Sequence, residues 1–160
     1  MTESGTIAVK AHKLYKVFGR RAKEAVQALA GGATRNDVED LGTAAVIDAS
    51  FEVKAGEIFV VMGLSGSGKS TLIRMLNGLL EPTSGTVTIG STDISGIPPK
   101  RLRDVRRSKV SMVFQHFALM PHRTVLDNAA YALEVQGMAQ QEREKRPRRL
   151  IHPARTRGWR

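Results

Sequence analysis

The sequence contains no cysteine, which excludes disulfide bridges and thiolate metal sites. It also lacks a long apolar run. The longest, residues 58–63 and 43–47, fall far short of the roughly 20 residues that a membrane-spanning helix needs. Residues 1–6 include an acid and no apolar core segment, so no secretory signal is expected. We therefore expect a chain that is soluble or that reaches a membrane only through another protein.

Acidic residues are few, 15 against 25 Lys and Arg, and the formal net charge is +10. Residues 143–160 hold eight Lys or Arg and one Glu, which leaves only +3 for residues 1–142. The excess lies in a terminal tail, so nucleic acid is not an expected partner of the body of the chain. Residues 146–160 show neither helical nor strand periodicity. We interpret them as a disordered, foreign end, such as a frameshifted gene product would carry. The alternative is a basic arm for RNA, DNA or anionic lipid.

The order of elements predicts a single α/β domain over residues 1–145. Residues 58–62 form a continuous apolar run that is typical of a strand covered on both faces. A small helical insert is expected at residues 20–43, with Thr34 and Asp37 spaced like a capping box. The other expected strands are residues 7–15, 45–53, 86–89 and 110–114, and the expected helices are residues 21–29, 69–80, 98–107 and 124–135.

The strongest motif is GLSGSGKS at residues 63–70, which matches the phosphate-binding P-loop pattern. Glycines let the backbone N–H groups turn toward phosphate oxygens, and the following helix adds its N-terminal partial charge. We expect Lys69 to reach the β- and γ-phosphates of ATP and the Ser70 hydroxyl to bind Mg²⁺. The nucleotide-binding residues predicted here are Gly63, Leu64, Ser65, Gly66, Ser67, Gly68, Lys69, Ser70 and Thr71.

Four sequence blocks resemble the ATP-binding subunits of ABC transporters. They are GEIFVVMGLSGSGKST at residues 56–71, GLLEPTSG at 78–85, VSMVFQ at 110–115 and FALMPHRTVLDN at 117–128. With the helical insert, the last block is similar to importers of glycine betaine and proline. The resemblance covers about residues 6–145 and implies a partial P-loop ATPase core with an N-terminal antiparallel β subdomain. It also implies two partners, a transmembrane permease subunit and a second copy of the ATPase, at the cytoplasmic face of the cell membrane.

The resemblance assigns roles to two residues outside the loop. Gln115 would contact Mg²⁺ or the attacking water, as a catalytic and metal-binding residue. Phe18 would stack on adenine, with Tyr15 as the weaker candidate. His116 and His122 are expected to be ordinary surface residues because no acidic residue accompanies them.

The sequence departs from the family pattern after residue 145. An LSGGQ-like signature, a Walker B strand with its glutamate and a switch histidine are absent from residues 116–160. We therefore expect a truncated chain that does not hydrolyse ATP alone. The alternatives are a non-enzymatic fragment, a small basic binding module and, less well matched, a P-loop kinase.

Overall fold

The computed structural model of the protein describes residues 5–114, 119–143 and 145. It consists of two compact units, Met1–Ser111 and Met112–Arg160. Within the described residues, no helix has the length and apolar character that crossing a bilayer requires. The first unit contains, in order, β1 (Ile7–Phe18), α1 (Ala22–Ala30), the short 3-10 helix η1 (Asn36–Val38), β2 (Thr43–Lys54), α2 (Lys69–Leu76), β3 (Ser84–Ile89), β4 (Thr92–Asp93) and α3 (Pro99–Lys109).

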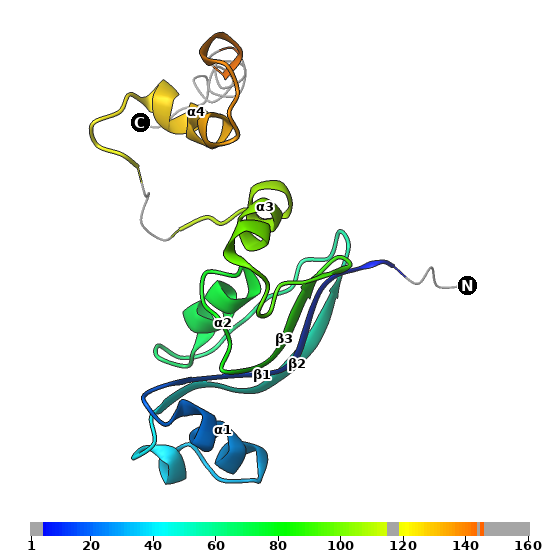
Figure 1. The fold of residues 1–160 in the computed structure, drawn as a ribbon, viewed down its shortest axis with the longest axis vertical. Coiled ribbons are helices and arrows are strands. Elements are labelled where there is room, and N and C mark those ends of the chain that lie inside the picture. Colours follow the sequence, from blue (N-terminus) through cyan, green and yellow to red (C-terminus); the bar gives the residue numbers. More distant parts are fainter. Residues whose placement is uncertain (1–4, 115–118, 144, 146–160) are drawn as a thin grey trace, which may run out of the picture. The chain divides into compact units, whose positions relative to one another are not determined.

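The strands of the first unit form one antiparallel sheet in the order β2-β1-β3-β4 (Figure 1). A bulge interrupts β1 at Lys13, whose φ is 45° and whose N–H donates to Ser50 Oγ at 2.8 Å. Because the bulge adds one residue to the strand, Ala11 and Leu14 contribute to the same cluster although they are three positions apart. The predicted antiparallel subdomain is confirmed.

Two apolar clusters hold the first unit together. One joins the sheet to α2 and α3, and its most deeply buried members include Leu14, Met75 and Val87. The other joins the end of β1 and the start of β2 to the segment between these strands. Its members include Ala25 and Val38, which are both fully buried. α1 and α2 therefore cover apolar sheet surface that would otherwise face water.

The helical insert at residues 20–43 is confirmed as α1 followed by η1. The expected capping box is half formed. The Asp37 carboxylate accepts hydrogen bonds from the Thr34 N–H and the Thr34 hydroxyl, each at 2.7 Å. The Thr34 hydroxyl therefore donates to the Asp37 carboxylate. In a capping box it would instead accept a hydrogen bond from the Asp37 amide.

Two of the expected strands are wrong. Residues 58–62 and 110–114 have no regular secondary structure and pair with no strand in the described part of the chain. Ile58 is 90% exposed and Val113 is 97% exposed. A parallel strand needs hydrogen-bonding neighbours, and no strand of the described residues pairs with either segment. One ring does anchor the first segment, because Phe59 stacks on Phe51 of β2 with 4.7 Å between centroids.

The helix expected at residues 69–80 ends four residues earlier. Asn77 is the C-cap, the Gly78 N–H donates to the Met75 carbonyl at 3.0 Å, and the Leu79 N–H donates to the Arg74 carbonyl at 2.9 Å. This pair of bonds is a Schellman motif, which satisfies the last carbonyl groups and turns the chain away from the helix axis.

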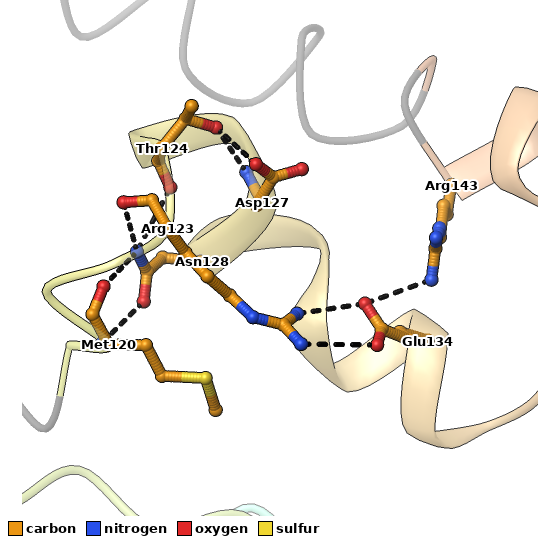
Figure 2. A network of polar contacts seen from close by, with 7 residues as sticks. All are labelled: Met120, Arg123, Thr124, Asp127, Asn128, Glu134 and Arg143. Carbon is orange, nitrogen blue, oxygen red and sulfur yellow. Dashed lines mark hydrogen bonds and ion pairs between the residues drawn. The ribbon is translucent and has the colours of Figure 1, made fainter.

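The second unit is built around α4 (Val125–Val135), and Figure 2 shows the polar contacts at its start. Thr124 caps the helix by accepting from the Asp127 N–H at 3.1 Å, as the sequence predicted. The Asn128 side chain accepts from the Met120 N–H at 2.8 Å and donates to the Met120 carbonyl at 3.2 Å. The turn before the helix is therefore tied to its first residues.

Near the end of α4, Glu134 forms ion pairs with two arginines (Figure 2). Its carboxylate lies 2.9 Å from Arg123 Nη1 and 2.9 Å from Arg143 Nη1. The hydrogen bond from Arg123 is the main reason that the pKa of Glu134 lies below its usual value. Within the second unit, these contacts tie the turn and the segment after α4 to the helix.

Candidate functional site

The loop at residues 63–70 follows the segment 58–62 and leads into α2. Gly66 and Gly68 have φ values of 77° and 90°, a region that residues with a Cβ rarely adopt. A Cβ on Gly66 would meet no atom within 4 Å, whereas a Cβ on Gly68 would collide with the Ala45 carbonyl oxygen of β2. Gly68 is therefore the point at which the loop packs on the antiparallel sheet.

Gly68 is also the N-cap of α2, and its carbonyl accepts the Leu72 N–H at 2.8 Å. The first N–H groups of any helix lack partners inside the helix and carry its positive dipole end. In this chain those groups belong to Lys69, Ser70 and Thr71, at the end of the glycine-rich loop. The arrangement suits an anion, because donors of the loop and of the helix start are close together.

The Lys69 ammonium lies across the loop. It donates to the Gly63 carbonyl at 2.8 Å, to the Leu64 carbonyl at 2.6 Å and to Ser67 Oγ at 3.3 Å. These acceptors engage the three donors that an ammonium offers. A positive charge is thus fixed inside the curve of the loop, where a phosphate group would need it.

A hollow of about 320 Å³ lies between the loop, β2 and α2. Gly63, Ser67 and Lys69 line it on one side, and β2 contributes apolar residues such as Ala45 and Ile47. Among the described residues that line it, two are cationic and none is acidic. The residues present therefore fit a phosphate group, and the exposed Ser70 at the start of α2 offers the hydroxyl expected for Mg²⁺.

The two aromatic candidates differ in exposure. Phe18 is 45% exposed at the end of β1, and the Lys16 ammonium lies 5.2 Å from its ring centroid. Tyr15 is only 7% exposed and packs in the second cluster, so it offers no free ring face for a base. Phe18 does not line the hollow beside the loop.

Several predicted features lie outside the described residues, namely Gln115, His116 and the tail at residues 146–160. His122 is described and is exposed in a turn before α4, as expected. Among the described residues, no group of three or more His, Asp, Glu or Cys side chains could hold a metal ion.

One residue beside the loop was missed by the sequence reasoning. Arg35, from the helical insert, lines the same hollow as Lys69. It belongs to no motif and lies 34 positions before Lys69 in the chain, so only the folded structure brings the two side chains to one site.

A family model described as ABC transporter matches residues 46–157. This range includes residues 146–157 of the tail, for which the sequence predicts a foreign end. The boundary at residue 145 and the disorder of the tail stay predictions.

Curated relatives match along most of the chain. The glycine betaine transport ATP-binding protein OpuAA of Bacillus subtilis is 53% identical over 88% of this chain and 34% of its own length. The glycine betaine/proline betaine transport ATP-binding protein ProV of Salmonella typhimurium is 49% identical over 88% of this chain and 36% of its own length. The chain thus spans about a third of the length of these relatives.

A solved structure supports the fold. A dimeric ATP-binding cassette in a post-hydrolysis state, bound to ADP and Pi, superposes with a TM-score of 0.67 at 30% sequence identity. The match covers 86% of this chain and 53% of that one. The P-loop ATPase fold predicted from the sequence is confirmed in this partial form.

Proposed function

Because this chain belongs to the ABC transporter family, we propose that it binds ATP with Mg²⁺ through residues 63–71, as the ATP-binding part of an importer. The observation that carries the proposal is the position of Lys69, whose ammonium donates to the carbonyls of Gly63 and Leu64 inside the loop. A cation held there, beside glycine N–H groups and a helix start, is what the phosphate chain of a nucleotide requires.

Different residues of the loop bind different parts of MgATP. The backbone N–H groups of residues 63–71 cradle the phosphates, and Lys69 turns from the loop carbonyls toward the β- and γ-phosphates. The Ser70 hydroxyl binds Mg²⁺, which supplies charge neutralisation at the phosphates when it is bound. Gln115 contributes to the metal and water site, and Phe18 offers its exposed ring to adenine.

We propose glycine betaine and proline betaine as the class of transported substrate. The glycine betaine relatives match over 88% of this chain, whereas a methionine import ATP-binding protein of Bacillus licheniformis matches over 67% at 50% identity. Greater coverage at similar identity favours the osmoprotectant importers. The alternative of a basic binding module depends on the tail, which lies outside the described residues.

The proposed partners follow from this role. A transmembrane permease subunit would hold the chain at the cytoplasmic face of the membrane. A second copy of the ATP-binding subunit would face the nucleotide, since the related solved cassette is a dimer. No nucleic acid is proposed as a partner, because the described body of the chain is only mildly basic.

Calorimetric titration of the chain with MgATP tests the proposal. Lys69→Ala should weaken binding about 10-fold to 150-fold, since a charge-assisted hydrogen bond contributes about 1.5–3 kcal/mol. Lys100→Ala makes the same change on the exposed surface of α3 and should alter the affinity less than about twofold. Equal affinities of the Lys69→Ala variant and the unchanged chain would refute the assignment.

A further inference from the structure

The helical insert between β1 and β2 is firmly held on both sides of Arg35. On one side, Thr34 donates twice to the Asp37 carboxylate at 2.7 Å. On the other, the Val38 side chain is fully buried in the second apolar cluster. The backbone at Arg35 is thus fixed, although its side chain is exposed.

The Arg35 side chain lines the hollow that Lys69, Ser67 and Gly63 also line. Within the described part of the chain, this side chain takes part in no hydrogen bond or ion pair. None of the described residues that line the hollow is acidic, so no described carboxylate balances the charges of Arg35 and Lys69 there. A guanidinium that serves the fold would usually contact a carboxylate or a carbonyl, and this one does neither.

We propose that Arg35 is a second cationic residue of the nucleotide site and binds the phosphate chain of ATP. The inference rests on the proposed binding of ATP by the loop, and it assigns a role to the helical insert. A guanidinium offers donors in a planar fork that matches two phosphate oxygens, and its charge complements a polyanion. Because the backbone at Arg35 is already fixed, ATP binding has to order only the side chain.

The two cations reach the hollow from different parts of the chain. Lys69 approaches the phosphates from the start of α2, while Arg35 approaches from the insert beside β2. The two side chains can then contact different phosphate oxygens. The remaining walls are apolar, such as Ala45 and Ile47, and these weaken the competition of water for the same oxygens.

Calorimetry on the full 160-residue chain tests the inference, with MgATP and inorganic tripolyphosphate as separate probes. Arg35→Gln should weaken the binding of both probes at least about fivefold, because both offer phosphate oxygens. Arg101→Gln removes the same charge from the exposed surface of α3 and should change neither affinity more than about twofold. Arg35→Lys should recover part of the loss, since the charge is kept and the fork is not.

Each outcome bears on one claim. Unchanged binding by Arg35→Gln, with binding lost by Lys69→Ala, overturns the role of Arg35 and leaves the loop as the ATP site. A loss for MgATP without a loss for tripolyphosphate overturns the phosphate contact. If the unchanged chain binds neither probe, the proposed function fails and the inference fails with it. A lower melting temperature of the ligand-free Arg35→Gln variant would show that Arg35 serves the fold instead.

Discussion

Gly66 and Gly68 allow backbone strain and steric collision to be separated within one loop. Both have a positive φ, 77° and 90°, so replacing either by alanine places a Cβ in the left-handed region. That conformation costs a residue with a Cβ about 1–2 kcal/mol. Only at position 68 would the new Cβ also meet a neighbouring atom, the Ala45 carbonyl oxygen. Gly66→Ala is therefore a matched control for Gly68→Ala.

The collision adds a second cost, because β2 or the loop must move to admit the methyl group. Inserting a methyl group into a packed site typically costs about 1–3 kcal/mol, so Gly68→Ala should lose about 2–5 kcal/mol in total. At about 2–4 °C per kcal/mol for a chain of this size, Gly66→Ala should lower the melting temperature by about 2–8 °C. Gly68→Ala should lower it further.

Thermal unfolding followed by circular dichroism measures both variants under the same conditions. Melting temperatures that agree within about 2 °C would refute the reasoning, because the shared strain would then account for the whole effect. The packing of the loop on Ala45 would in that case contribute nothing to stability.

The remaining predictions concern the core, a helix cap and acid. Leu14→Ala should lower the free energy of unfolding by about 3–5 kcal/mol in urea titrations, because Leu14 is fully buried, while Leu64→Ala at an 85% exposed position should cost far less. Thr124→Ala should destabilise α4 by about 1 kcal/mol, because the hydrogen bond from the Asp127 N–H to the Thr124 hydroxyl is lost. The loss of helical circular-dichroism signal on heating measures this effect. The Thr34 hydroxyl, followed by the Thr34 amide, lowers the pKa of Asp37. Its contribution to stability is thus present above its unfolded pKa of about 4 and is lost as the pH falls through the lower folded value. Asp37→Asn should remove this part of the pH dependence of the urea midpoint.

Elements whose signals lie within a few neighbouring residues could be predicted from the sequence. The predicted helix at residues 124–135 is confirmed, because Thr124 and Asp127 mark its start. The Thr124 hydroxyl accepts a hydrogen bond from the Asp127 N–H, as a helix cap does. The insert was correct for a similar reason, since paired glycines follow α1. The predicted end of α2 is wrong, because the apolar spacing continues to Leu79 while the helix ends before Gly78.

Features that depend on distant partners could not be predicted in this way. The apolar run at residues 58–62 favours a covered strand, yet Ile58 and Met62 are 90% and 85% exposed. The run itself is the same whether or not neighbouring strands pair with it, so the pattern cannot tell the two cases apart. Arg35 was missed for the same physical reason, because its nearness to Lys69 arises only when the insert folds against the sheet.

The loop nevertheless keeps a definite geometry beside the unpaired segment 58–62, because β2 and α2 provide its main support. Gly68 packs on the Ala45 carbonyl of β2, and α2 joins the cluster of the antiparallel sheet through Met75. Lys69 closes the loop through bonds to Gly63 and Leu64. The phosphate-binding half of the site thus depends on β2 and α2, both of which lie within Met1–Ser111. Substitutions that loosen β2 should therefore weaken ATP binding more than substitutions of the exposed side chains at residues 58–62.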